Sequence, residues 1–298
     1  MASRSRRLLI TDLDNTLYDW VTFFARAFDA MVDAMVDLLA VDRGTLLDEF
    51  RAVHQRLGDS EHPYAALELP SVRARYPDAN QSELALALDE PLHRFNSVRK
   101  ETLALYPGVE MTLTRLRQAG ITIVGHTEAI APNAYYRLTR LNIAQRFKHL
   151  YVLQGQPVNH PRPDRLPLLE PPRGLIRSIP RSERKPNPKL LLDICEREGV
   201  PASAAVYVGD SLVRDMSMAL DAGVTAVWAK YGTVYDPALW STLVRVTHWT
   251  AEDVEREKAL SGRRVEPDLA ISSFSELLPL FIDTRAADEV GPPRSQLN

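Results

Sequence analysis

The chain has 298 residues, of which 45% are apolar and 25% are charged, and its formal net charge is −3. These values are typical of a globular protein with one large α/β domain or a core plus a modest second domain, and they give no electrostatic reason to expect a nucleic-acid or anionic-membrane partner. The single cysteine, Cys195, excludes an internal disulfide framework and a CxxC zinc site. No apolar run reaches the ~20 residues of a membrane span, and Leu8–Ile10 is too short for the apolar region of a signal peptide. We therefore expect a cytoplasmic protein.

Short apolar and β-branched runs recur along the chain and predict buried strands. They are Arg7–Thr11, Ile121–Gly125, His149–Leu153, Ala204–Val208, Val224–Trp228 and Leu269–Ile271. Helical patterns such as Val109–Ala119 and Pro188–Glu198 lie between them. Strands that alternate with helices predict an α/β fold with a doubly wound parallel sheet, in which ligands bind beyond the carboxyl ends of the strands.

Residues 18–105, between the first two strands, show no strand pattern. The stretch Trp20–Leu39 repeats apolar side chains at three- and four-residue spacing, which predicts an amphipathic helix. Further helical patterns cover Thr45–Leu57 and Gln81–Leu105. The sequence therefore predicts a helical insertion that forms a small lid.

Three further segments depart from the alternating pattern. Seven prolines fall between Pro157 and Pro180, so we expect no regular helix or strand in residues 154–184. The arginines of this segment favour a solvated surface loop over a grip on an anionic substrate. Residues 236–260 predict a helical elaboration before the last strand, and the polar tail 284–298 predicts disorder.

Polar and charged side chains follow the predicted strands or open the helices after them. Two carboxylates two residues apart at the end of a buried strand are unfavourable unless a cation or a reaction needs them. In an extended chain, alternate side chains share a side, so Asp12 and Asp14 can face one ligand. The set consists of Asp12, Asp14, Thr127, Lys185, Asp210 and Asp215.

Hard oxygen ligands from Asp12, Asp210 and Asp215 suit Mg²⁺, which binds a few carboxylates, water and substrate phosphate. The cation offsets the repulsion among the carboxylates and an incoming phosphate dianion. Asp12 can then attack phosphorus to form an aspartyl-phosphate.

The remaining members of the set complete a phosphoryl-transfer site. Asp14 can donate a proton to the leaving oxygen and later activate the water that hydrolyses the intermediate. Thr127 and Lys185 can hold the phosphoryl oxygens as negative charge develops. The order of these groups at successive strand ends is more specific than any one of them alone.

Four segments resemble the four motifs of the haloacid dehalogenase-like (HAD) hydrolase superfamily: Asp12–Leu17, Thr127, Lys185–Pro188 and Gly209–Asp215. Tyr18-Asp19 extends the first motif in the manner of the phosphoglycolate phosphatase and nucleotidase branches. The helical insertion lies where this superfamily places its C1-type cap.

The resemblance implies a division of the chain and a role for each group. The core is expected in residues 1–17 and 106–283, including the segments 154–184 and 236–260, and the cap in residues 18–105. Asp12 is the nucleophile and Asp14 the acid/base. Mg²⁺ is bound by Asp12, the backbone carbonyl of Asp14 and Asp210, with Asp215 supporting the metal directly or through water.

The sequence departs from the usual motifs in three respects. Asn15 stands where the family often has glycine, although asparagine also tolerates the left-handed conformation of a tight turn. Glu128 follows Thr127 where a small or amide residue is usual, and the spacing from Thr127 to Lys185 is long. His126 is interpreted as a hydrogen-bonded structural histidine in preference to a substrate contact.

The sequence therefore predicts a Mg²⁺-dependent phosphatase of a small-molecule phosphate monoester, with sugar phosphates, phosphoglycolate and nucleoside monophosphates all compatible. The alternatives are a 2-haloacid dehalogenase-type hydrolase, which does not require the acid at Asp14, and a catalytically silent phosphate-binding relative. A phospho-aspartate receiver domain is rejected, because its phosphorylated aspartate ends the third strand and nothing suitable follows His149–Leu153. We expect no nucleic-acid or membrane partner, and the sequence favours no oligomeric state.

Overall fold

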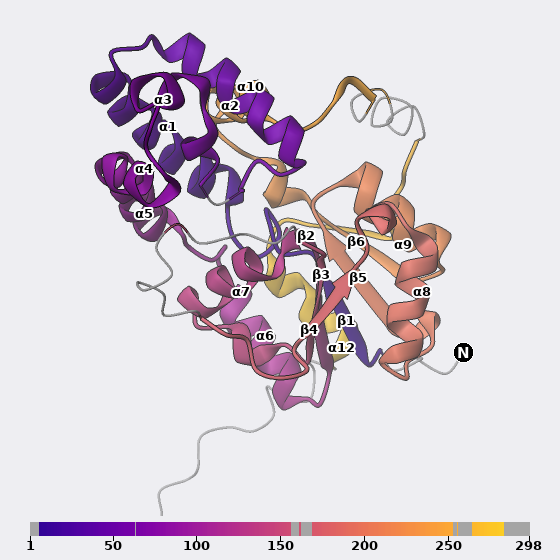
Figure 1. Cartoon of the computed structure of the whole chain (residues 1–298). Coiled ribbons are helices and arrows are strands. Elements are labelled where there is room, and N and C mark those ends of the chain that lie inside the picture. The colour runs from indigo at the N-terminus through magenta and orange to yellow at the C-terminus, as the bar shows by residue number, and fades with distance from the viewer. Residues whose placement is uncertain are drawn as a thin grey trace, which may run out of the picture.

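The computed structural model describes residues 6–62, 64–155, 161, 169–252, 255 and 264–282. Within these residues, seven parallel strands form one sheet in the order β4-β3-β2-β1-β5-β6-β7 (Figure 1). The strands are β1 (Leu8–Thr11), β2 (Thr122–Ile130), β3 (His149–Leu153), β4 (Ile176–Ile179), β5 (Ala205–Gly209), β6 (Thr225–Ala229) and β7 (Leu269–Ile271). The predicted α/β fold with a doubly wound parallel sheet is confirmed.

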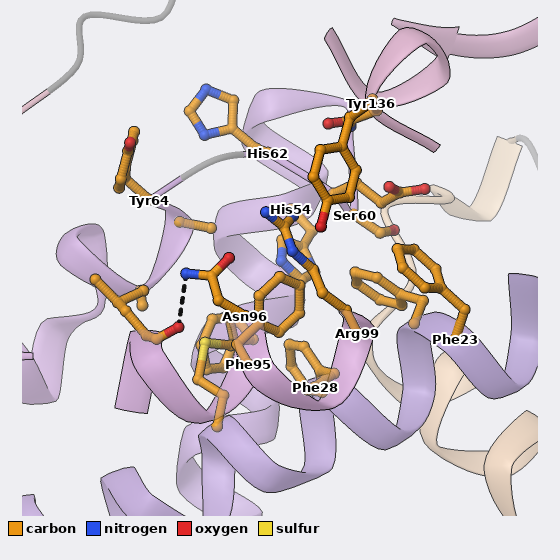
Figure 2. A pocket seen from close by; sticks show the side chains of 18 of the residues that line it. Phe23, Phe28, His54, Ser60, His62, Tyr64, Phe95, Asn96, Arg99 and Tyr136 are labelled. Atoms are coloured by element: carbon orange, nitrogen blue, oxygen red, sulfur yellow. Dashed lines mark hydrogen bonds between the residues drawn. The ribbon is translucent and has the colours of Figure 1, made fainter. Parts of the chain in front are cut away.

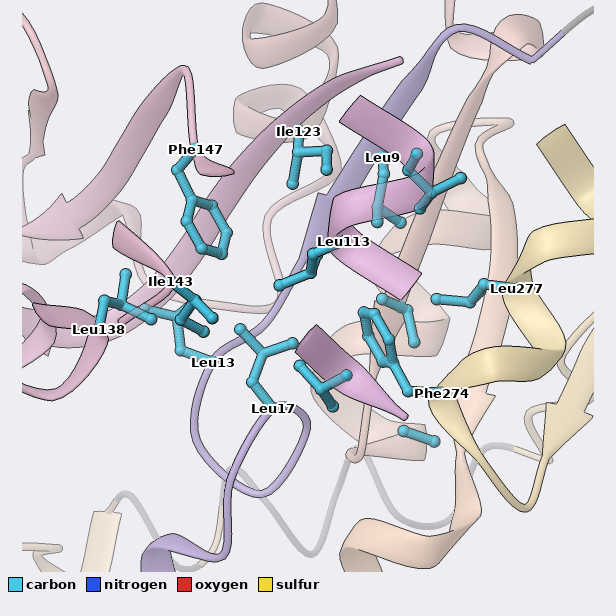
Figure 3. Packing of buried hydrophobic residues seen from close by; sticks show 14 of the residues in the cluster. Leu9, Leu13, Leu17, Leu113, Ile123, Leu138, Ile143, Phe147, Phe274 and Leu277 are labelled. Carbon is cyan, nitrogen blue, oxygen red and sulfur yellow. The ribbon is translucent and has the colours of Figure 1, made fainter. Parts of the chain in front are cut away.

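Helices cover both faces of this sheet because successive strand side chains point to opposite sides. Leu8 and Ile10 of β1 pack toward α8 and α9, whereas Leu9 packs toward α6, α7 and α12 (Figure 3). These helices are α6 (Val109–Gln118), α7 (Ala131–Arg140), α8 (Pro188–Arg197), α9 (Ser217–Asp221) and α12 (Leu278–Phe281). Short helical turns are η1 (Ala65–Glu68), η2 (Ala144–Arg146), η4 (Arg181–Glu183), η5 (Ala202–Ala204), η6 (Leu212–Met216), η7 (Lys230–Thr233) and η8 (Phe274–Leu277).

β4 corrects the expectation that residues 154–184 hold no regular structure. It pairs with β3 in parallel, with Leu150 opposite Ile176 and Leu153 opposite Ile179. The strand itself contains no proline: those in the described part of this segment are Pro161, Pro171, Pro172 and Pro180. The strand lies at the sheet edge, where only one side of the backbone needs a partner. Residues 156–160 and 162–168 lie outside the described residues.

The predicted insertion forms a separate set of packed helices: α1 (Trp20–Leu39), α2 (Arg43–Leu57), α3 (Pro70–Arg75), α4 (Gln81–Ala87) and α5 (Asp89–Thr102). Asp19 begins α1 by accepting the backbone N–H of Thr22. The segment predicted as one helical pattern, Gln81–Leu105, is divided at Leu88, and Pro91 lies in the first turn of α5, where its missing N–H is tolerated.

A later segment joins these helices. Helix α10 (Pro237–Val246) lies in the range expected to elaborate the core, but it runs beside α1 and α2 (Figure 1). Its buried residues Leu243 and Val246 pack among the side chains of these helices. We call α1–α5, η1 and α10 the helical unit. Residues 253, 254 and 256–263, like the tail from 283, lie outside the described part of the chain. None of the described helices combines the length and apolar character that crossing a membrane requires.

Two adjacent chain segments connect α1–α5 to the sheet. Tyr18 forms an isolated bridge with Leu105, and the backbone N–H of Tyr106 donates to the carbonyl of Leu17 at 2.9 Å. The exit from β1 and the return toward α6 therefore run side by side.

His54 supplies a pH-dependent test of how α10 packs. Its ring packs beside those of Phe28 and Phe50, and its Nδ1 donates to the carbonyl of Val246 at 2.7 Å. Burial lowers the pKa of His54 from 6.5 to about 4. Between pH 4 and pH 6.5, His54 therefore binds a proton in the unfolded chain but not in the folded protein. The contribution of neutral His54 to the free energy of unfolding is complete above pH 6.5 and is lost as the pH falls toward 4.

We expect His54 alone to reduce the free energy of unfolding by about 1 kcal/mol between pH 7.5 and 5.5. Urea denaturation of the wild type and His54→Gln at both pH values measures this, and the variant should show the smaller pH dependence. His93→Gln, at an exposed position of α5, controls for the loss of a histidine. Equal pH dependence in the wild type and His54→Gln would contradict the assignment.

Candidate active site

The carboxyl ends of β1 and β5 bring two aspartates together. These strands are neighbours with Thr11 opposite Val208, so the residues that follow them, Asp12 and Asp210, lie at the same edge of the sheet. Asp215 joins them from η6, a turn of π-helix after β5. Carboxylate oxygens of Asp12, Asp210 and Asp215 all lie within 4.8 Å of one another.

Lys185 lies against this cluster and is almost completely buried. Its Nζ is 2.9 Å from Asp12 Oδ1 and 2.9 Å from Asp215 Oδ1. Asp12 Oδ1 also accepts the backbone N–H of Leu13 at 2.8 Å. The ammonium thus links the end of β1 to η6.

The cluster carries more negative than positive charge. Burial, followed by the field of Asp215, raises the pKa of Asp210 to about 7. Burial also raises the pKa of Asp12, although Lys185 opposes it. Burial alone lowers the pKa of Lys185, but Asp12 and Asp215 raise it well above its ordinary value, so the ammonium stays charged. A cation bound by the carboxylates would offset the excess negative charge.

The local backbone makes room for this arrangement. A Cβ at Gly209 would lie 2.5 Å from Asp215 Cγ, so the end of β5 must lack a side chain. Gly232 of η7 approaches the β1 loop so closely that a Cβ would lie 1.7 Å from the carbonyl oxygen of Asn15. Asn15 itself adopts a left-handed conformation with φ 54°, which asparagine tolerates, and its side chain accepts the N–H of Trp20.

Thr127 lies on β2 beside β1, and its hydroxyl accepts the backbone N–H of Ala129 at 3.0 Å. Glu128 does not reach into the acidic cluster through any described contact. It accepts the backbone N–H of Lys185 at 3.2 Å and pairs with Arg214 at 3.0 Å. The unusual carboxylate after Thr127 therefore braces the segment that carries Lys185.

The described contacts of the Asp14 carboxylate are with residues outside the cluster that contains Asp12. Asp14 Oδ1 accepts the hydroxyl of Tyr18 at 2.8 Å and Nη1 of Arg137 at 2.6 Å. Arg137 is 1% exposed and extends its other nitrogen, Nη2, to Glu61. Trp20 donates to the second oxygen of Glu61 at 2.6 Å. A buried chain of contacts thus runs from Asp14 to the helical unit.

Sequence reasoning missed Arg137 and Tyr207. Arg137 lies three residues after Ala134 and one before Leu138, both of which are buried. A basic residue on the buried face of a helix is the sequence feature that could have identified it. Tyr207 is the hydroxyl-bearing residue in the apolar strand β5, and it donates to Asp215 at 3.1 Å. The buried ring of His126 lies 3.3 Å from the same hydroxyl, in line with its interpretation as a structural histidine.

A sequence profile of the haloacid dehalogenase-like hydrolases matches residues 7–223, and a second, HAD-hydrolase-like profile matches residues 182–277. The glyceraldehyde 3-phosphate phosphatase of Methanopyrus kandleri is 25% identical over 233 residues, which cover 77% of this chain and 86% of that protein. The phosphoglycolate phosphatase of Pseudomonas fluorescens Pf-5 is 29% identical over 233 residues, with coverages of 77% and 71%.

Solved structures share the fold. The 2-haloacid dehalogenase of Pseudomonas syringae pv. tomato DC3000 aligns with a TM-score of 0.54 and 22% identity, covering 92% of this chain and 97% of that one. The putative HAD-hydrolase YfnB of Bacillus subtilis, bound to magnesium, aligns with a TM-score of 0.51 and 16% identity, with coverages of 93% and 99%. Because the first profile extends over well more than half of the sequence, from β1 to the end of α9, this chain belongs to the haloacid dehalogenase-like hydrolase family.

Proposed function

We propose that the chain is a Mg²⁺-dependent phosphatase that hydrolyses a small phosphate monoester through a covalent intermediate on Asp12. The observation that carries this proposal is the buried contact of Asp12 with Lys185 beside Asp210 and Asp215. Phosphatase names among the relatives support the same reaction class.

The donor set fits a magnesium ion. Asp12, Asp210 and Asp215 offer hard carboxylate oxygens close together, and their excess negative charge calls for a cation. We assign these three carboxylates, with the backbone carbonyl of Asp14, to the metal. Bound Mg²⁺ supplies positive charge that offsets repulsion between the carboxylates and the phosphate dianion.

Asp12 is the proposed nucleophile. Its Oδ1 accepts both described bonds, from Leu13 and Lys185, so we assign Oδ2 to the attack on phosphorus. The new Oδ2–P bond forms as the bond from phosphorus to the leaving oxygen breaks. Lys185 and the Thr127 hydroxyl hold the phosphoryl oxygens during this transfer.

Asp14 is the proposed acid and base. Tyr18 and Arg137 both bind its Oδ1, so we assign the proton transfer to Oδ2. The carboxyl gives its proton to the leaving oxygen in the first step. In the second step it takes a proton from the water that attacks phosphorus, and the Asp12 Oδ2–P bond breaks to release phosphate.

The part of the helical unit that lies in residues 18–105 is the proposed cap. We assign residues 18–105 to the cap and residues 1–17 and 106–283 to the core, with α10 as a core segment that packs on the cap. The adjacent connections at Tyr18 and Leu105 are the proposed hinge. A lid of this kind excludes water and favours substrates that fit beneath it.

Hydrolysis of phenyl phosphate tests the reaction. We expect turnover with Mg²⁺, its loss in EDTA and its return when Mg²⁺ is added in excess. Asp12→Asn should reduce kcat/KM by more than ~10³-fold, because the amide cannot act as the nucleophile. Asp37→Asn, at an exposed position of α1, is the matched control and should keep wild-type turnover. Turnover that persists in EDTA or in Asp12→Asn contradicts the proposal, and metal-independent halide release from a 2-haloacid would support the dehalogenase alternative.

Asp14→Asn separates the two chemical steps. Without a base to activate water, the aspartyl-phosphate should persist, while overall turnover falls by about 10²–10⁴-fold. Mass spectrometry after acid quenching should show the variant carrying one phosphoryl group. A slow variant that never shows this added mass would overturn the role of Asp14 in hydrolysis of the intermediate.

A further inference from the structure

A cavity of about 170 Å³ lies between the helical unit and α7 (Figure 2). Aromatic and aliphatic side chains of α1, α2 and α5 form much of its lining, among them Phe23, Phe28 and Phe95. Asn133, Tyr136 and Arg137 line it from α7. An apolar cavity of roughly 150 Å³ is large enough to hold a benzene ring, so this one has room for a ring with a small substituent.

Arg99 of α5 contributes a guanidinium group to the lining of this cavity. Its guanidinium carbon lies 4.5 Å from the centre of the Tyr136 ring and 5.4 Å from that of Phe95 (Figure 2). Its Nε is buried without a hydrogen-bond partner, and among the described residues no carboxylate forms an ion pair with Arg99. Burial lowers the pKa of Arg99, although Tyr136 and Glu61 oppose this shift.

A second polar atom in the lining also lacks a partner. The Nδ1 atom of His62 is buried with no hydrogen bond to the described residues. Buried polar groups are nearly always satisfied by protein, water or a ligand. Arg99 and His62 are therefore suited to a ligand that brings hydrogen-bond acceptors into the cavity.

The cavity lies one side chain away from the proposed acid/base. Arg137 lines it and at the same time donates to Asp14 Oδ1 at 2.6 Å, and Glu61, the other partner of Arg137, lines it as well. Arg137 therefore links the lining of the cavity to the carboxylate of Asp14.

We propose that this cavity binds the leaving group of the substrate, and that this group is a ring-sized apolar body with a carboxylate that pairs with Arg99. This inference rests on the proposed phosphatase function. The carboxylate satisfies the guanidinium, and the ring packs against Phe23, Phe28 and Phe95.

Two isosteric esters test the proposal: 4-carboxyphenyl phosphate and its neutral analogue 4-carbamoylphenyl phosphate. The wild type should hydrolyse the carboxylate ester with the lower KM. Arg99→Met should raise KM for the carboxylate ester by about 10- to 100-fold, the usual loss for a charge-assisted hydrogen bond, and should leave KM for the carbamoyl ester nearly unchanged. Arg99→Lys should retain part of the preference for the carboxylate ester that Arg99→Met loses.

Arg94→Met is the matched control, because Arg94 lies on the same helix, is exposed and pairs with Glu90. It should keep the wild-type ratio of KM values. If the wild type hydrolyses both esters equally well, or if Arg99→Met changes both KM values alike, the inference is wrong while the phosphatase function stands. If neither ester nor phenyl phosphate is hydrolysed with Mg²⁺, the proposed function itself fails.

A binding measurement covers the case in which Arg99→Met does not fold. Titration calorimetry of the wild type with 4-hydroxybenzoate, the leaving group alone, should show binding about 10-fold or more tighter than that of 4-hydroxybenzamide. Equal binding of the two compounds, or binding of neither, overturns the inference.

Discussion

The register of β1 against β5 places Asp12 and Asp210 at one edge of the sheet, and η6 adds Asp215, so carboxylates gather where little water is available to screen them. Lys185 stabilises this cluster through ion pairs with the carboxylates of Asp12 and Asp215. Removing one partner from such a buried pair is strongly destabilising, because the other charge stays buried. Much of the surrounding structure serves to hold these charges, from Glu128 on the Lys185 backbone to the missing side chain at Gly209.

Asp14 depends on a different set of contacts. Arg137 comes from α7 on the core side, Tyr18 from the connection after β1, and Glu61 from the helical unit. The position of the Asp14 carboxylate is therefore coupled to the placement of the helical unit over the sheet. A displacement of the helices that separates Glu61 from Arg137 removes one of the two carboxylates that neutralise a fully buried guanidinium, so the pair favours the arrangement seen here.

Much of the core could be predicted from local patterns, because buried strands and amphipathic helices leave periodic signals. His149–Leu153, Leu269–Ile271 and Trp20–Leu39 have the predicted bounds. β4 could not be predicted, since its formation depends on pairing with β3 and not on its own composition. In the site, the closeness of Asp12 and Asp210 follows from their places after neighbouring strands. The contacts of Asp14 could not be predicted in this way, because the alternation of side chains ends where the backbone turns at Asn15. Its partner Arg137 is 123 positions away, so no local sequence pattern indicates the contact.

The prolines and arginines around β4 bear on how this edge strand avoids pairing with other molecules. An exposed strand edge offers unpaired backbone groups to other molecules of the same chain, and charged residues and prolines are the usual means of blocking such pairing. Here Arg177 projects from the strand, Pro172 and Pro180 lie on either side of it, and Arg181 binds the carbonyl of Gln154 at 3.2 Å. The proline and arginine content that argues against a strand thus protects the sheet from growing by intermolecular association.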